Sequence, residues 1–337
     1  MADPGKHIEH SKKLWVDQVN PELMNDIIRE FPDMSIDSKE KHESTHEVLC
    51  RSGPMMEGVK SEEVPGIGRK FHSEEGSYTK ATTAAVLYIH GGGRIMGAYD
   101  SGINNFLCCR IAKLLNAPVL SAIYRLAPKH PFPAGLDDLV AAYIWLVESI
   151  KKDSPSINTE TIQIAISGES SGGGLAAELC QRLLDEHDNN KTNQYPLPVA
   201  QLLIYPMLDD RTSIDADNSL PPHLIWSHTS NLYAWSAYLG LHHKPGEDKL
   251  PEYASAARRR NLEGLPPMWI AVGDLDIFFP ECQDYARRLK DAGIPTEYLE
   301  VKGAYHGFVG LGSGEETPVL NVWSSFRDFA LLYLKAP

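Results

Sequence analysis

The pentapeptide Gly168-Glu169-Ser170-Ser171-Gly172 directly follows the apolar run 162–166 and directly precedes a helical pattern. A serine at a sharp strand-to-helix turn, flanked by glycines, is typical of a nucleophile elbow, where the hydroxyl projects above the edge of a sheet. Ser170 is therefore the candidate nucleophile. Ser171 does not fit the centre of the pattern, because Glu169 stands two positions before it, and we expect it to offer a backbone N–H.

The chain alternates apolar runs with helical patterns. The apolar runs lie near 84–90, 117–124, 162–167, 199–205, 267–273 and 296–302, and the helical segments include 134–152, 172–186, 280–292 and 318–335. This alternation predicts an α/β fold with a mostly parallel central sheet, flanked by helices on both faces. Functional groups then gather at the carboxyl ends of the strands.

Two regions interrupt the alternation. Residues 1–45 have helical spacing but no strand partner, and residues 208–256 are rich in aromatic side chains between polar, proline-containing loops. We interpret 1–45 and 208–256 as two parts of a helical cap, and 46–207 and 257–337 as the two parts of the core. The cap aromatics either wall a substrate pocket or pack the cap helices onto the core.

A glycine-rich loop precedes the elbow in the sequence. The strand-like run 84–89 ends in His90-Gly91-Gly92-Gly93. Glycines after a strand leave backbone N–H groups free to face a ligand, and in acyl transfer such donors stabilise the oxyanion. We assign this oxyanion-hole role to the N–H groups of Gly92, Gly93 and Ser171.

The base is selected by sequence order. In a serine hydrolase built on such an elbow, the acid and then the histidine follow the serine. Of the thirteen histidines, only His306 follows the carboxylates of Asp274 and Asp276, and it lies in a loop after the strand-like residues 297–301. Both aspartates follow the apolar run 268–272, so the residues alone leave open which one orients His306.

These motifs carry a family resemblance. The combination of H-G-G-G, G-E-S-S-G-G, Tyr124-Arg125-Leu126-Ala127-Pro128 with Phe132-Pro133-Ala134, and Tyr305-His306-Gly307-Phe308 resembles the hormone-sensitive-lipase-like family of α/β hydrolases, from about residue 45 to the C-terminus. In that family the catalytic acid stands nine positions before a tyrosine. The corresponding tyrosine here is Tyr285, so the resemblance implies that Asp276 is the acid. The segment 205–211 and Trp226 further resemble a subgroup of microbial carboxylesterases.

The resemblance implies an activity. It predicts a serine carboxylesterase that hydrolyses short- to medium-chain acyl esters with Ser170, Asp276 and His306 as the catalytic triad. The expected partner is a small-molecule ester, without cofactor or metal, and a homodimer is possible. Trp226 and Tyr205 are candidates for substrate binding. A deacetylase, amidase or lactonase could use the same triad and is the main alternative.

Position 94 departs from the family pattern, because Arg94 stands where a large apolar or aromatic residue is common. A cation there could bind a polar or carboxylate-bearing substrate. Alternatively, its guanidinium pairs with a nearby acid and faces away.

Two other functions are weighed. Residues 42–46 read H-E-x-x-H, the pattern of a zinc hydrolase, but no third ligand is evident nearby. The same family also contains plant hormone receptors, in which the catalytic histidine is replaced, whereas His306 is present here.

The amino-acid composition limits which classes of partner and which cellular compartment are expected. A net charge of −13 opposes binding to nucleic acid or to an anionic membrane. Five cysteines without framework spacing indicate free thiols in a reducing compartment. The first residues lack the apolar core of a signal peptide, and no stretch approaches the roughly 18 apolar residues of a membrane helix. We therefore expect a cytoplasmic protein.

Overall fold

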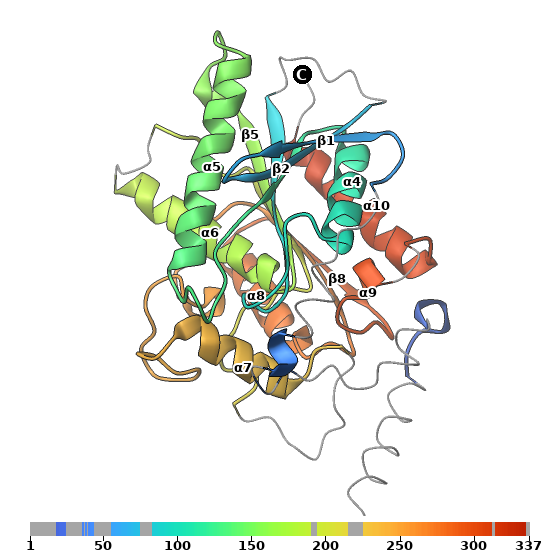
Figure 1. The fold of residues 1–337 in the computed structure, drawn as a ribbon, viewed down its shortest axis with the longest axis vertical. Helices are drawn as coiled ribbons and strands as arrows, with labels where there is room; N and C mark the ends of the chain where they lie inside the picture. The colour runs from blue at the N-terminus through green and yellow to red at the C-terminus, as the bar shows by residue number, and fades with distance from the viewer. Residues whose placement is uncertain are drawn as a thin grey trace, which may run out of the picture.

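The computed structural model describes residues 18–24, 36, 38, 40–43, 55–74, 83–189, 194–214, 225–311 and 314–334. Within these residues the centre is an eight-stranded sheet in the order β1-β2-β4-β3-β5-β6-β7-β8 (Figure 1). The strands are β1 (Val59–Val64), β2 (Gly68–Ser73), β3 (Ala84–Ile89), β4 (Val119–Ala122), β5 (Gln163–Glu169), β6 (Ala200–Ile204), β7 (Met268–Gly273) and β8 (Thr296–Val301). Strand β2 is antiparallel to β1 and β4, and all other neighbours are parallel, which confirms the predicted sheet.

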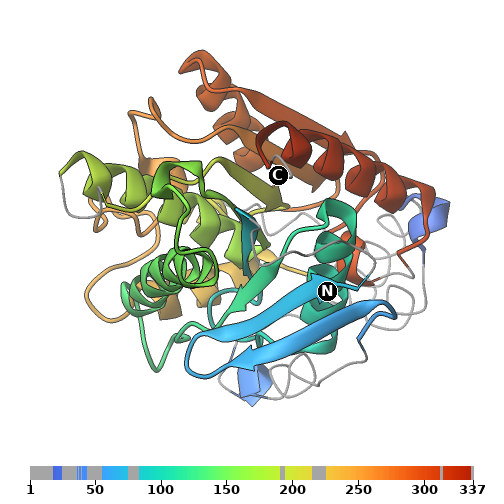
Figure 2. The same ribbon diagram turned by 90° about the horizontal axis from the view of Figure 1, so that it is seen from above.

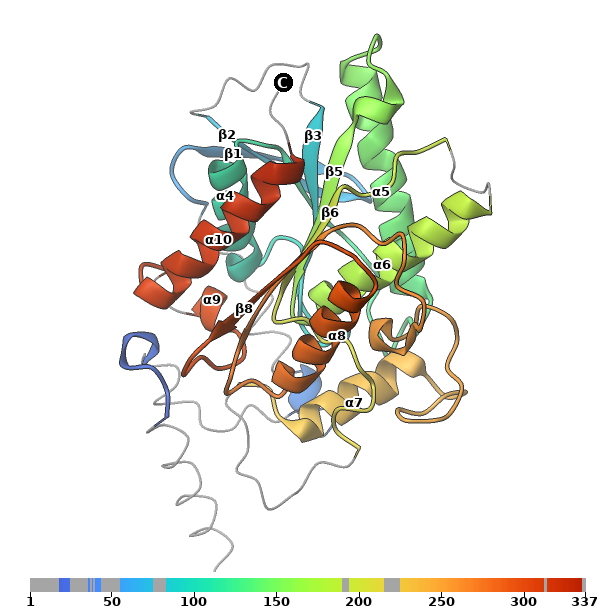
Figure 3. The same cartoon turned by 180° about the vertical axis from the view of Figure 1, so that it is seen from behind.

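Helices cover both faces of the sheet. The helices whose bounds the structure describes are α4 (Gly102–Leu115), α5 (Ala134–Asp153), α6 (Ser171–Asp188), α7 (His228–Leu239), α8 (Phe279–Asp291), α9 (Phe308–Leu311) and α10 (Thr317–Tyr333), with short 3₁₀ turns at Pro21–Leu23, Thr159–Thr161 and Ala256–Arg258. Helices α4 and α10 lie on one face, and α5, α6 and α8 lie on the other (Figures 2 and 3). This two-sided cover explains why the central strands read as continuous apolar runs.

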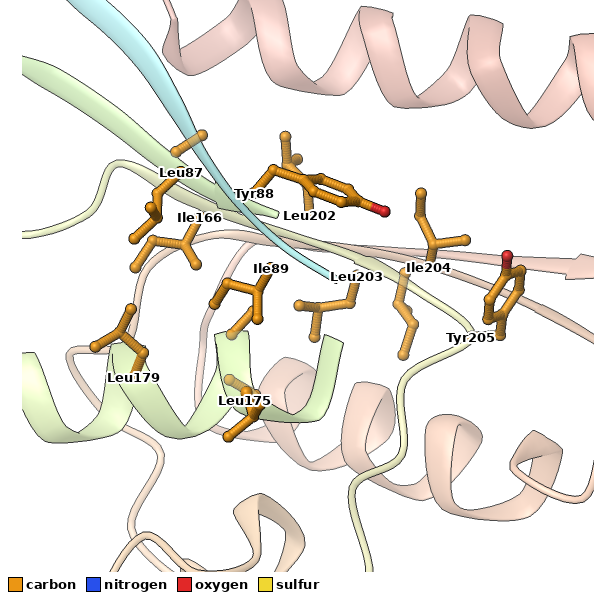
Figure 4. Packing of buried hydrophobic residues seen from close by; sticks show 14 of the residues in the cluster. Leu87, Tyr88, Ile89, Ile166, Leu175, Leu179, Leu202, Leu203, Ile204 and Tyr205 are labelled. Carbon is orange, nitrogen blue, oxygen red and sulfur yellow. The ribbon is translucent and has the colours of Figure 1, made fainter. Parts of the chain in front are cut away.

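Part of the hydrophobic core lies between the central strands and α6. Every residue of β3 and β6 is buried. Ile89 of β3 and Leu203 of β6 point toward Leu175 of α6, whereas Tyr88 points to the opposite face (Figure 4). This packing fixes α6, and therefore the turn at its start, against the middle of the sheet.

The segment 208–256 leaves the core after β6 and returns before β7. Its one described helix, α7, lies beyond the carboxyl ends of the strands, at the bottom of Figure 1. At the base of the segment, the two carboxylate oxygens of Asp210 each lie 2.7 Å from a nitrogen of Arg258, and one of them also accepts from the Gly246 amide. Most of the predicted N-terminal cap segment, 1–45, lies outside the described residues, so the division into core and cap stays a prediction.

Candidate active site

Ser170 lies at the turn between β5 and α6, with its backbone in the left-handed region (φ 55°, ψ −125°). This conformation costs free energy in a residue that has a Cβ, so contacts with the surrounding structure must hold it. The Ser170 amide donates to the carbonyl of Ile204, and its carbonyl accepts from Met207, both at 2.9 Å. A Cβ on Gly172 would lie 2.2 Å from the carbonyl oxygen of Ile89, so only glycine lets the helix start this close to β3.

The structure brings Ser170, His306 and Asp276 together. Ser170 Oγ lies 2.9 Å from His306 Nε2, and His306 Nδ1 lies 2.7 Å from Asp276 Oδ2. All three residues are buried, with 6%, 5% and 3% of their surfaces exposed. A carboxylate facing Nδ1 fixes the tautomer in which Nδ1 carries a proton and Nε2 can accept the serine proton. The arrangement can therefore generate a serine nucleophile.

Aromatic rings surround the imidazole. The rings of Tyr205 and Phe278 meet it edge-on, with centroids 5.0 and 5.1 Å away, and that of Trp226 lies at 6.4 Å. Tyr205 is only 1% exposed and also contacts the ring of Phe308. Tyr205 thus contacts the catalytic imidazole directly, and its contact with substrate stays a prediction.

Two amides of the glycine loop have no hydrogen-bond acceptor among the residues that the structure describes. The Gly91 amide donates to Glu169 Oε1 at 2.7 Å. Within the described residues, the amides of Gly92 and Gly93 donate no hydrogen bond. Both residues have a positive φ, 106° and 63°, and a Cβ on Gly93 would lie 2.7 Å from Trp226 Cη2. Two free N–H groups beside a serine are what an oxyanion hole requires.

Ser171 links the glycine loop to the start of α6. Its hydroxyl accepts a hydrogen bond of 3.0 Å from the Arg94 amide. The Ser171 side chain therefore has a partner of its own, in addition to the backbone N–H that the sequence analysis assigned to the oxyanion hole.

The Arg94 guanidinium is enclosed. The residue is 1% exposed, and its Nη2 lies 2.8 Å from Glu178 Oε1. In this structure the charge of Arg94 is paired with the buried carboxylate of Glu178, and direct binding of substrate by Arg94 stays an untested prediction. The other possibility stated above, pairing with a nearby acid, is the one that the geometry supports.

Three residues near the site were missed by the sequence analysis. Burial raises the pKa of Glu169, whose carboxylate holds the Gly91 amide. Glu178 lies in the buried apolar stretch 175–180 of α6, and an acid in such a stretch signals a buried partner. The Phe278 amide donates to Asp276 Oδ1 at 2.9 Å, a contact that we did not predict from the sequence.

No metal cluster is evident in the part of the chain that the structure describes. Those residues contain no group of three or more His, Cys, Asp or Glu side chains that could hold an ion. His42 Nε2 lies 2.7 Å from the Ile95 carbonyl oxygen, and His46, the second histidine of the H-E-x-x-H pattern, lies outside the described residues. None of the described helices is both long and apolar enough to span a membrane.

Known proteins resemble this chain. A family model described as alpha/beta hydrolase fold matches residues 86–310. Esterase LipI of Mycobacterium tuberculosis is 33% identical over 234 residues, which are 68% of this chain and 67% of LipI. Lipase 2 of Moraxella sp. is 32% identical over 286 residues, which are 77% of this chain and 63% of that lipase. The matches thus span about two thirds of the relatives' own length.

Solved structures share the fold. Esterase LipW from Mycobacterium marinum superposes with a TM-score of 0.76 at 24% identity, covering 95% of this chain and 97% of LipW. The family match spans well over half of the chain and contains the elbow, both aspartates and His306. The chain therefore belongs to the α/β-hydrolase-fold family, within the hormone-sensitive-lipase-like group that its sequence motifs resemble.

Proposed function

We propose that this protein is a serine carboxylesterase that hydrolyses short- to medium-chain acyl esters through an acyl-enzyme. The observation that carries the proposal is the chain of contacts from Ser170 Oγ to His306 Nε2 at 2.9 Å and from His306 Nδ1 to Asp276 Oδ2 at 2.7 Å. The relatives named esterase and lipase support ester hydrolysis as the reaction.

The reaction proceeds in two halves. Ser170 Oγ attacks the ester carbonyl while His306 Nε2 takes the hydroxyl proton, and Asp276 stabilises the resulting imidazolium. His306 then gives the proton to the leaving alcohol, which leaves the acyl group on Ser170. In the second half, water loses a proton to His306 and attacks the acyl-enzyme, and Ser170 regains its proton as the acid departs.

Backbone amides bear the charge of the tetrahedral intermediate. The amides of Gly92 and Gly93 lack an acceptor among the described residues, which supports their role as oxyanion donors together with the Ser171 amide. Losing one such donor typically costs on the order of a hundred- to a thousandfold in rate. The apolar rings around His306 keep this region poor in water, which strengthens each of these interactions.

A cavity of about 60 Å³ borders the glycine loop and is lined in part by Gly91, Gly92, Ile103 and Glu169. Trp226, whose ring lies over Gly93, stays the candidate for a substrate contact on the cap side. We propose that α7 and the segment around it act as that cap.

The cellular setting is a further part of the proposal. The four cysteines that the structure describes are free and buried, and burial raises their thiol pKa values. Buried free thiols support the reducing cytoplasm as the compartment. The net charge of −13 supports a small-molecule substrate over nucleic acid or an anionic membrane.

Hydrolysis of p-nitrophenyl esters from acetate to laurate tests the proposal. The wild type should turn over short and medium chains, and Ser170→Ala should abolish turnover while the far-UV spectrum is unchanged. Ser167→Ala is the matched control, because the Ser167 hydroxyl lies in the same strand but donates to the Leu202 carbonyl. It should keep wild-type turnover.

Each other outcome points to a different function. Turnover that persists in Ser170→Ala but is lost with EDTA would indicate a metal hydrolase. Labelling of Ser170 by a fluorophosphonate without turnover of any ester would indicate an amide or lactone substrate. The absence of both labelling and turnover would favour a receptor.

A further inference from the structure

The backbone of Arg94 continues the glycine loop in an unusual conformation. Its φ is 64°, in the left-handed region that glycine adopts freely and that a residue with a Cβ adopts at a cost. Its amide donates to Ser171 Oγ at 3.0 Å, and its carbonyl accepts from the Ala127 amide at 3.0 Å. Glycine could make both of these backbone hydrogen bonds without that cost. An interaction of the Arg94 side chain must therefore offset the cost of the positive φ.

The guanidinium binds the helix that carries the nucleophile. Arg94 Nη2 lies 2.8 Å from Glu178 Oε1, with the two side chains 1% and 0% exposed. Burial raises the pKa of Glu178 to about 7, and Arg94 opposes this shift. Arg94 also donates to the carbonyls of Met207 and Ala254, both at 3.3 Å. These contacts fix the loop relative to α6.

The same guanidinium binds the segment that covers the site. Its central carbon lies 4.2 Å from the ring centroids of both Trp235 and Tyr238 of α7. The Tyr238 hydroxyl donates to Glu178 Oε2 at 3.2 Å, which closes the cluster. Arginine suits such a site because its flat cation can stack on rings and pair with a carboxylate at once.

We propose that Arg94 is a positioning residue for the oxyanion hole. It holds the amides of Gly92 and Gly93 in place relative to Ser170, and it makes their position depend on the docking of α7. This role rests on the proposed serine esterase function. Oxyanion donors act at 2.7–3.1 Å, and a misplacement of about 1 Å can cost on the order of a hundredfold in rate.

Buried ion pairs are poor sources of stability. The desolvation of the two charges offsets most of their attraction, and replacing both partners by neutral residues is often harmless to the fold. Removing one partner leaves a buried charge without a counterion and destabilises strongly. A double substitution therefore separates a role in folding from a role in positioning.

The test compares Arg94→Met, Glu178→Gln and the double variant Arg94→Met/Glu178→Gln, by melting temperature and by kcat and KM on p-nitrophenyl butyrate. We expect the double variant to melt above Arg94→Met, yet to keep a kcat about 10- to 100-fold below wild type with KM within about threefold. Affinity for a trifluoromethyl ketone, whose adduct places an oxyanion in the hole, should fall by a similar factor.

Two further substitutions isolate the side chain. Arg94→Gly removes the backbone cost of the positive φ, and we still expect a reduced kcat because the anchor is lost. Arg94→Lys keeps the charge but not the stacking plane, and should be intermediate. The matched control is Arg259→Met/Asp185→Asn, which removes a different ion pair, at 2.6 Å, between Asp185 of α6 and Arg259 after the 3₁₀ turn Ala256–Arg258. Its kcat should equal that of the wild type.

The outcomes separate the two proposals. A kcat that recovers together with the melting temperature in the double variant, or a wild-type kcat in Arg94→Gly, would overturn the positioning role and leave the esterase intact. A wild type that neither hydrolyses esters nor is labelled at Ser170 by a fluorophosphonate would instead overturn the proposed function, and the positioning role with it.

Discussion

Asp274 and Asp276 are two positions apart, but their carboxylates bind different partners. Asp276 Oδ2 lies 2.7 Å from His306 Nδ1. Asp274 Oδ1 accepts a hydrogen bond from the Gly303 amide at 2.7 Å, and its Oδ2 lies 3.5 Å from Lys302 Nζ. One carboxylate thus contacts the imidazole, and the other contacts the start of the loop that carries it.

We expect Asp276→Asn to lower kcat by roughly 10⁴-fold, because an amide facing Nδ1 favours the wrong tautomer of His306. Asp274→Asn keeps an acceptor for the Gly303 amide and should stay within about tenfold of the wild type. Steady-state kinetics on one ester compares the two. A similar loss in both variants would mean that the loop contact matters as much as the tautomer.

Ser171→Ala tests the link between the glycine loop and α6. Without the hydroxyl, the buried Arg94 amide loses its acceptor, which should cost about 1–3 kcal/mol in the free energy of unfolding. We expect kcat to fall about tenfold, less than the loss of a whole oxyanion donor, because the Ser171 amide remains. Urea unfolding and kinetics measure the two effects. Wild-type values in both would show that this hydrogen bond is dispensable.

Gly93→Ala tests the packing of Trp226 on the loop. A Cβ there would lie 2.7 Å from Trp226 Cη2, at a φ of 63° that costs alanine roughly 1–2 kcal/mol. We expect most activity to be lost. Because Trp226→Phe removes the clashing part of the indole, Gly93→Ala/Trp226→Phe should regain part of kcat relative to Gly93→Ala, with Trp226→Phe alone as the reference. If the double variant does not regain kcat, the loss of activity comes from the backbone strain alone and not from the clash with Trp226.

Asp210→Asn should have a pH-dependent effect on stability. Burial would raise the pKa of Asp210, but hydrogen bonds from Arg258 and the Gly246 amide outweigh it and lower the pKa below its ordinary 3.8. A lowered folded-state pKa contributes stability above about pH 3.8, and that stability is lost as the pH falls through the folded-state value. The variant should therefore unfold more easily than wild type at pH 7, by about 1.5–3 kcal/mol, with the gap narrowing below pH 4.

Asp209→Asn is the control for this pH series. Asp209 pairs with Arg211, whose side chain is half exposed, and such a pair contributes at most about 1 kcal/mol. Thermal unfolding between pH 3 and 7 compares both variants with wild type. A constant gap across this range for Asp210→Asn would contradict a role for its charge.

The central parallel strands were predictable because most of their side chains are apolar. Strands such as β3 and β6 are buried along their whole length, so they read as unbroken apolar runs. Strands β1 and β2 were not among the predicted strands. β1 reads Val-Lys-Ser-Glu-Glu-Val and is largely exposed at the sheet edge, so only its pairing with β2 makes it a strand.

The site was predictable to the extent that its residues stand at strand ends. Ser170 and His306 follow β5 and β8, and parallel topology brings such positions to one edge of the sheet. The direction of the Arg94 side chain was not predictable. Its carboxylate partner lies 84 residues away, and its ring contacts come from α7, which follows no strand directly. Such contacts depend on tertiary packing and leave no local pattern.

The ion pair between Asp210 and Arg258 has a consequence for how such proteins can be changed. It ties together the two ends of the segment between β6 and β7, so the chain leaves and rejoins the sheet at one place. The intervening residues can then be lengthened, shortened or exchanged while the register Gln201↔Met268 of those strands is kept. We therefore expect this segment to be exchangeable, provided that a transplanted one again places two aromatic rings on Arg94, as Trp235 and Tyr238 do.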